Sequence, residues 1–347
     1  MNPNQIPQIE SIFLELTNAC NLHCQFCPSD RQTRSRTIMP KELAVRLLHE
    51  VHDLGLEGHL LFHVMGEPML HPDFFEILEL NQEITGIPPE ILTNGLVITP
   101  DVINRLQQFP LKQLTLSWQA IDESTFRKYR GPTSQFTYQD YYRQIMPLLT
   151  AAFRGRLQSP LEIDIMVTRY DHSMGIYIVE SLDQARCFVN ELYDRLRNNI
   201  PDLAPFPKVE IFHLSGHNVL TLSAHVNLRF RPIHPFTGFD ESVERQATTE
   251  HFCHLPFYQL VVLADGRVTM CCLDYDGQIG LGHVRDSSLA DIWFSEKALK
   301  IREKFLIGEN IPALCRRCQK ITKKRNRFHS RYRYYLDKWH FFLLKNS

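Results

Sequence analysis

The chain has 347 residues, of which 44% are hydrophobic and 22% are charged, and its formal net charge is −1. This composition is typical of a globular enzyme, and no apolar run approaches the roughly 18–20 residues of a transmembrane helix, which excludes a membrane-spanning protein. The charge is uneven, because residues 319–347 carry nine Lys or Arg and one acid. We therefore expect the tail, 321–347, to be a separate basic and aromatic segment.

Apolar strand-like runs alternate along the chain with longer segments of helical periodicity. The pattern predicts six strands, at 12–17, 59–65, 89–93, 113–119, 161–168 and 208–214. It predicts five intervening helices, at 40–54, 72–82, 100–107, 138–153 and 175–198. Six β-α units indicate a parallel sheet with crossover helices, either doubly wound or curled into a barrel.

Three cysteines, Cys20, Cys24 and Cys27, follow the first predicted strand. The N-terminus shows no signal sequence, so we expect a cytoplasmic protein with reduced thiols rather than disulfides. A zinc site would need a fourth ligand with finger-like spacing, and the following residues offer only scattered histidines. Zinc remains an alternative. Three thiolates on one loop can also hold three corners of a [4Fe–4S] cluster and leave its fourth iron open.

The loops after the second and third predicted strands are also suited to ligand binding. They read Met65-Gly66-Glu67-Pro68 and Thr93-Asn94-Gly95. Glycine allows close approach of the backbone to a ligand, and a carboxylate accepts hydrogen bonds from an amino group. Because ligands of parallel α/β proteins bind at the carboxyl ends of the strands, we expect these loops and the cysteines to share one rim.

A second group of cysteines lies in the C-terminal third of the chain. Four thiolates are the predicted ligands of a second metal centre, Cys253, Cys271, Cys315 and Cys318. They would saturate either a zinc ion or a [4Fe–4S] cluster. Adjacent side chains point in different directions, so only one of Cys271 and Cys272 is expected to be a ligand, and Cys271 is chosen by its position in the motif. Cys187 lies in a helical pattern and is expected to pack in the core.

The first cysteine loop, with Phe26 before its last cysteine and Gly66-Glu67 after the second strand, resembles the radical S-adenosylmethionine (SAM) superfamily. The resemblance implies an α/β fold with a partial (β/α)6 barrel, a [4Fe–4S] cluster on Cys20, Cys24 and Cys27, and SAM on its open iron. By position it implies six SAM-binding residues, Gly66, Glu67, Ser117, Arg130, Ser215 and Gly216. Where the family usually has a first glycine this chain has Met65, which would be strained if its φ angle were positive.

The cysteines of the C-terminal third, with an Asp265-Gly266 turn and a helix capped by Ser288, resemble the SPASM/Twitch extension of radical SAM enzymes. This implies a small α+β domain with an auxiliary [4Fe–4S] cluster, giving domains at 1–235 and 236–320 before the tail. A fully ligated cluster cannot chelate SAM, so its expected role is to pass an electron. The resemblance therefore implies a radical SAM oxidoreductase that dehydrogenates its substrate, reduced by a partner such as flavodoxin or ferredoxin.

The residues leave the substrate open. The predicted barrel begins within the first dozen residues, without a leader-recognition module before it, which favours a small molecule. A maturase that modifies a ribosomally made peptide is the alternative, and a non-catalytic metal-binding protein is a further one. The basic tail would suit an acidic partner. A C-terminal helix that packs its aromatic side chains on the barrel explains the tail equally well.

Overall fold

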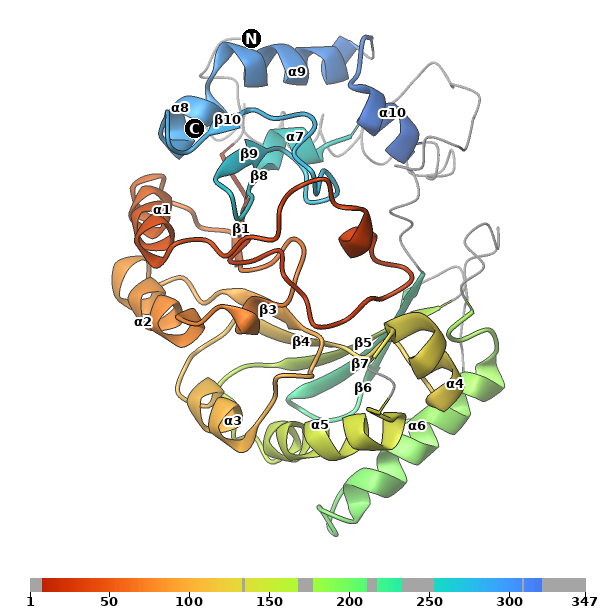
Figure 1. Cartoon of the computed structure of the whole chain (residues 1–347). Coiled ribbons are helices and arrows are strands. Elements are labelled where there is room, and N and C mark those ends of the chain that lie inside the picture. The colour runs from red at the N-terminus through yellow and green to blue at the C-terminus, as the bar shows by residue number, and fades with distance from the viewer. Residues whose placement is uncertain are drawn as a thin grey trace, which may run out of the picture.

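The structure is a computed structural model that describes residues 8–132, 135–167, 177–210, 217–232, 253–307 and 309–319. One ten-stranded sheet curves through these residues, in the order β10-β9-β8-β1-β2-β3-β4-β5-β7-β6, with helices along its outer side (Figure 1). The strands are β1 Ser11–Leu14, β2 His59–Leu61, β3 Glu90–Thr93, β4 Gln113–Ser117, β5 Leu161–Val167, β6 Asn218–Thr221, β7 Val226–Pro232, β8 Gln259–Val262, β9 Arg267–Thr269 and β10 Gly282–His283.

The helices of the first part of the chain are α1 Lys41–Asp53, α2 Phe74–Ile84, α3 Pro100–Leu106, α4 Glu123–Thr125, α5 Tyr138–Phe153 and α6 Leu182–Arg197. Those of the second are α7 Leu255–Tyr258, α8 Leu289–Trp293, α9 Glu296–Ile307 and α10 Ala313–Gln319. Each of the neighbours β1, β2, β3, β4, β5 and β7 runs parallel to the next. The α/β partial barrel expected from the sequence is therefore confirmed. None of the described helices is long and apolar enough to cross a bilayer.

The two faces of the sheet differ in chemistry. Alternate residues of a strand point to opposite faces, and one set, such as Ile163 and Ile165 of β5, is fully buried in the core shared with the helices. The other set faces the concave side of the barrel. It is apolar near β1 and β8, where Phe13 packs with Val261, and polar on β5 and β7.

The sixth parallel strand lies elsewhere than the sequence predicts. Residues 208–210 are not in a strand, and 211–214 fall outside the described residues. The strand that pairs in parallel with β5 is β7, which follows β6 in an antiparallel hairpin. Its strict alternation of apolar Val226, Leu228 and Phe230 with polar residues is the half-buried pattern that the prediction overlooked.

Two predictions about α6 are wrong in detail. The helix was expected over 175–198 but begins at Leu182, where the Ser181 hydroxyl accepts a hydrogen bond from the Gln184 N–H at 3.2 Å and caps the helix. Cys187, expected in the core, is exposed. The buried stripe of α6 runs through Ala185, Phe188 and Leu192, and at 100° per residue position 187 falls off that stripe.

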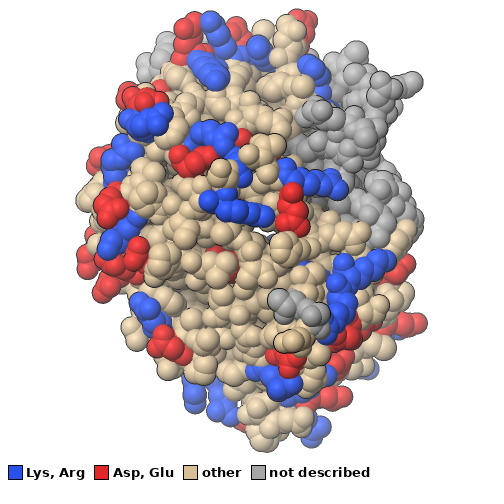
Figure 2. All heavy atoms as spheres, in the orientation of Figure 1, with Lys and Arg blue, Asp and Glu red and all other residues tan. Residues whose placement is uncertain are grey.

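The C-terminal part continues the barrel sheet directly. Strand β8 pairs in parallel with β1, and β9 returns antiparallel to β8 through a turn in which Gly266 has a φ of +88°. The predicted hairpin and the Ser288-capped helix, α8, are both present. The predicted domain boundary at 235/236 and the tail lie outside the described residues. On the face in Figure 2, acidic and basic side chains are interspersed rather than gathered into a patch of one sign.

Candidate functional site

The first cysteine loop follows β1 and is partly buried. Cys20, Cys24 and Cys27 are all of intermediate exposure, and the aromatic Phe26 is buried in the core. Burial raises the pKa of Cys24 to about 11 and that of Cys27 to about 12. The positive charge of Arg130 acts in the opposite direction on Cys24 and lowers its pKa. Three soft donors thus share one loop and are partly sheltered from water.

Gly66 and Glu67 lie directly against this loop. The Glu67 N–H donates to the Ala19 carbonyl at 2.8 Å, and Gly66 has a φ of +77°. A Cβ at Gly66 would lie 2.4 Å from the Thr17 carbonyl oxygen, so only glycine fits. Met65 is not among the described residues with positive φ, and its N–H donates to Glu15 at 3.0 Å. The departure from the family pattern is thus accommodated without strain.

The Glu67 carboxylate is buried and points toward the loop after β3. It accepts hydrogen bonds from the backbone N–H groups of Asn94 at 2.7 Å and Met69 at 3.3 Å. Burial raises the pKa of Glu67 to about 7, although these donors and the nearby charge of Arg130 act in the opposite direction. The side-chain amide of Asn94 donates to Asn21 at 2.7 Å and lies 3.7 Å from the Cys20 sulfur.

Arg130 completes this group from the π-helical turn Phe126–Arg130. Its guanidinium is buried and donates to the carbonyls of Ser117 at 2.6 Å and Asn94 at 2.8 Å. Its Nε–H has no hydrogen-bond partner among the described residues. A buried donor without a partner is costly, and a ligand carboxylate would satisfy it. The structure thus brings Arg130 near Glu67 and into contact with the Ser117 carbonyl, whereas Ser215 and Gly216 lie outside the described residues.

These residues suit the cluster and SAM that the sequence suggests. Three thiols on one loop are suitable ligands for three irons of a cluster. Gly66 allows the backbone of its loop to approach closely, and the unsatisfied Nε–H of Arg130 is available for a carboxylate. Among the described residues, no three His, Cys, Asp or Glu side chains converge as a ready site for a single metal ion. The fit therefore rests on the donor types and their surroundings, not on preformed ligand geometry.

The second cysteine group surrounds a small cavity in the C-terminal part. Cys253, Cys271 and Cys315 line it together with apolar side chains, among them Met270, Leu255, Ile279 and Phe305. Cys272 instead packs against Phe13, Val261 and Leu263 on the concave side of the sheet. Cys318 lies one helical turn after Cys315 on α10, and its side chain is not described. The roles of all four predicted ligands remain predictions.

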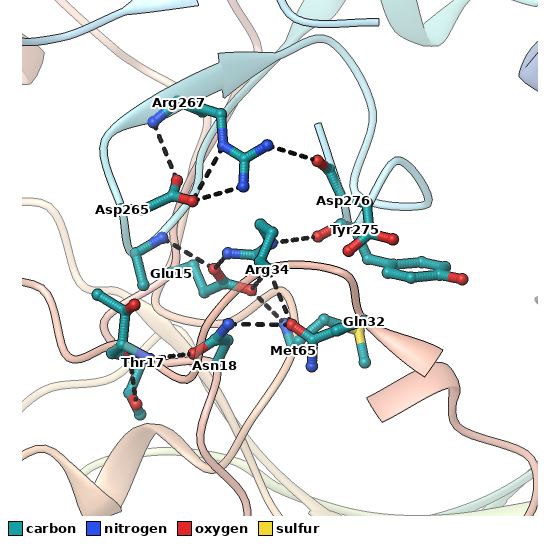
Figure 3. A network of polar contacts seen from close by, with 12 residues as sticks. Glu15, Thr17, Asn18, Gln32, Arg34, Met65, Asp265, Arg267, Tyr275 and Asp276 are labelled. Atoms are coloured by element: carbon teal, nitrogen blue, oxygen red, sulfur yellow. Dashed lines mark hydrogen bonds and ion pairs between the residues drawn. The ribbon is translucent and has the colours of Figure 1, made fainter. Parts of the chain in front are cut away.

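A buried ion pair, missed from the sequence, links the cysteine loop to the C-terminal part (Figure 3). Arg34 donates to the two carboxylate oxygens of Glu15 at 2.7 and 2.9 Å, and both side chains are essentially unexposed. Glu15 also accepts from the Ala264 N–H at 2.8 Å, while Arg34 Nε donates to the Tyr275 carbonyl at 2.7 Å. One carboxylate at the end of β1 thus joins three segments that are distant in sequence.

Comparison with known families identifies both parts. Residues 14–149 match the model of the radical SAM superfamily, and residues 253–319 match the SPASM iron–sulfur cluster-binding domain. The chain belongs to the radical SAM superfamily. As a radical SAM protein with a C-terminal SPASM domain, it is expected to hold a SAM-binding [4Fe–4S] cluster and an auxiliary cluster.

Curated relatives of this radical SAM protein carry out diverse chemistry. It is 29% identical to the AdoMet-dependent heme synthase of Methanosarcina barkeri over 126 residues. This match covers 35% of this chain and 34% of the heme synthase. It is 31% identical over 159 residues to the mycofactocin maturase MftC of Mycobacterium tuberculosis, covering 45% and 37%. A cofactor-modifying protein of tungsten-containing aldehyde ferredoxin oxidoreductase from Pyrococcus furiosus is 21% identical over 82% of this chain and 81% of its own length. The first two matches thus span little more than a third of those relatives.

Solved structures share the fold at low identity. The structure of BtrN with AdoMet and 2-DOIA has a TM-score of 0.51 at 17% identity, covering 90% of this chain and 93% of that one. A histidine-tagged form of anSMEcpe with bound AdoMet has a TM-score of 0.53 at 16% identity, covering 98% and 95%. These similarities establish the architecture of the radical SAM protein.

The half-buried His63 predicts a pH-dependent stability. Burial lowers its pKa to about 4 from 6.5, and its ring packs edge-on against Phe13 at 5.7 Å between ring centres. The unfolded chain therefore binds a proton that the folded chain does not, so stability falls as the pH drops from 6.5 toward 4. When the pH falls from 7.5 to 5.5, we expect the free energy of unfolding of the wild type to fall by about 1 kcal/mol more than that of His63→Leu. Anaerobic thermal melts of both proteins would measure the difference, and a constant difference would contradict it.

Proposed function

We propose that this protein cleaves SAM reductively to methionine and a 5′-deoxyadenosyl radical, which abstracts a hydrogen atom from the substrate. We further propose that the substrate radical then loses an electron to the auxiliary [4Fe–4S] cluster and a proton, which completes a two-electron dehydrogenation. The observation that carries the proposal is the convergence of Cys20, Cys24, Glu67 and Arg130 at the carboxyl ends of the strands. The second cysteine group in the same chain supports the oxidative outcome.

The protein's own residues have binding and positioning roles in this proposal. Glu67 accepts from the SAM amino group, and the unpartnered Nε–H of Arg130 donates to the SAM carboxylate. Gly66 keeps the backbone of its loop within contact of the cysteine loop, and Ser117 offers its hydroxyl to the ribose. Burial of Glu67 and Arg130 excludes water from these two groups and strengthens their electrostatic contacts. Ser215 and Gly216 would lie near the adenine.

Modification of a peptide or a peptide-derived cofactor is the second candidate function. The similarity to mycofactocin maturase MftC supports it, as does the shared architecture with Streptococcus suis SuiB, solved bound to precursor peptide SuiA, at a TM-score of 0.51 and 16% identity. In either case a one-electron donor such as flavodoxin or ferredoxin in a reducing cytoplasm would supply the electron. The basic tail would contact an acidic partner.

Anaerobic reconstitution tests the proposal. We expect about eight irons and eight sulfides per chain, and 5′-deoxyadenosine when the protein is reduced with SAM present. Cys253→Ala should lower the iron content by about half, because it removes one predicted ligand of the auxiliary cluster. Iron and sulfide assays, with chromatography of the nucleoside, provide the measurements.

Cys187→Ala is the matched control, because Cys187 is exposed on α6 and belongs to neither cysteine group. It should leave the iron content unchanged. Stoichiometric zinc without SAM cleavage would support the non-catalytic alternative and reject the proposal. Tightly bound iron without formation of 5′-deoxyadenosine would reject the radical mechanism but leave the iron–sulfur clusters supported.

A further inference from the structure

A cluster of charged side chains on the concave face of the sheet has no part in the cysteine sites. It projects from β5 and β7, on the face opposite the helices, and consists of Glu162, Asp164, Arg229 and Arg231. Asp164 is completely buried, whereas the side chains of Arg229 and Arg231 remain 30% and 21% exposed. The carboxylate of Asp164 is therefore internal, and the two arginine side chains remain partly accessible.

The two arginines are bound differently. Arg229 contacts two carboxylates, Asp164 at 3.1 Å through Nε and Glu162 at 2.7 Å through Nη2. Arg231 donates to Asp164 at 2.7 Å through Nε. No other side-chain hydrogen bond of Arg231 occurs within the part of the chain that the structure describes. Its Nη1–Nη2 edge is therefore available for a partner, and this edge matches the spacing of two oxygens of an anion.

Hydrogen bonds connect this cluster to the proposed SAM site. The Gln119 side-chain amide donates to Asp164 Oδ2 at 2.7 Å and lies 3.3 Å from the Ser117 hydroxyl, while its carbonyl oxygen accepts from the Met166 N–H at 2.7 Å. Gln119 is fully buried with a φ of +51°, in the left-handed region that non-glycine residues rarely adopt. Residues held in such conformations cluster at functional sites, and here the conformation orients Asp164 beside Ser117.

We propose that Arg231, oriented by Asp164 and Gln119, binds a carboxylate or phosphate group of the substrate. The inference rests on the proposed function, because Ser117 would contact the ribose of SAM and the reacting C–H group must lie near that ribose. Arg231 is at the carboxyl end of β7, on the same rim as the cysteine loop. Asp164 is a positioning residue in this arrangement. The substrate class is therefore an anionic molecule held at its charged group.

Arginine modification tests the inference without requiring a known substrate. The reconstituted protein is treated anaerobically with phenylglyoxal in the presence of inorganic phosphate, acetate or sodium chloride of equal ionic strength, and modified arginines are located by mass spectrometry. We expect phosphate or acetate, but not chloride, to protect Arg231. Mass action gives about fivefold protection when the probe is at about four times its Kd. Stronger protection by phosphate than by acetate would indicate a phosphate group on the substrate, and the reverse would indicate a carboxylate.

Arg143, which is 70% exposed on α5, is the internal control and should react equally in every condition. Asp164→Asn should reduce the protection of Arg231 by phosphate, because the guanidinium loses its orienting charge. If this variant does not fold, the wild-type comparison with chloride still decides the matter. Equal effects of all three anions on Arg231, or equal protection of Arg143, would overturn the inference. Protection without 5′-deoxyadenosine formation would reject the proposed function but leave the anion site standing.

Discussion

Arg34→Met should destabilise the protein by about 3–5 kcal/mol, because it leaves the Glu15 carboxylate buried without its charged partner. The pair has exposed fractions of 1% and 0%, so water cannot replace the lost guanidinium. The Arg34 bond to the Tyr275 carbonyl would be lost as well, which removes one of the hydrogen bonds between the cysteine loop and the C-terminal part. Chemical denaturation of the reconstituted protein under anaerobic conditions would measure the loss.

Arg285→Met is the matched control for that experiment. Arg285 pairs with Asp286 at 3.3 Å, but the two side chains are 75% and 64% exposed. A surface pair of this kind contributes about 0–1 kcal/mol, so this variant should unfold nearly as the wild type does. Adding Glu15→Gln to Arg34→Met should restore part of the stability, since the amide removes the buried charge. Similar losses for Arg34→Met and Arg285→Met would show that the buried network is not an important link.

Gly66→Ala should displace the cysteine loop and abolish stable SAM binding. The new Cβ would lie 2.4 Å from the Thr17 carbonyl oxygen and 2.7 Å from that of Ala19, and neither backbone atom can move without shifting the loop. The positive φ adds about 1–2 kcal/mol of conformational strain. We expect a loss of several kcal/mol in stability and reduced iron at the first cluster. Iron content and SAM binding by equilibrium dialysis provide the measurements.

Gly86→Ala separates the effect of the steric contact from the effect of the positive φ angle. Gly86 has a similar φ of +66°, but a Cβ there would meet no atom within 4 Å. It should therefore show only the conformational strain of about 1–2 kcal/mol, with normal iron content. If Gly66→Ala behaved like Gly86→Ala, the close approach of the two loops would have no functional importance.

Local patterns in the sequence determined the parallel sheet, five of its six predicted strands, and the two cysteine groups. Strand and helix periodicities arise from residues close in sequence, and cysteine spacing reports the type of donor directly. Gly66 and Glu67 were recognisable for the same reason, since a short motif after a strand carries its own chemistry. The divergence of adjacent side chains is also a local rule, and it predicts that only one of Cys271 and Cys272 is a ligand.

Only the tertiary structure decided which distant residues meet. Glu15 lies in an apolar strand, and nothing near it in sequence indicates that Arg34 and the Ala264 N–H will surround its carboxylate. Likewise, Asp164 and Arg231 become partners because β7, rather than the predicted segment at 208–214, pairs with β5. Pairing across a sheet depends on register and on the path of the chain between strands, neither of which is encoded by local periodicity.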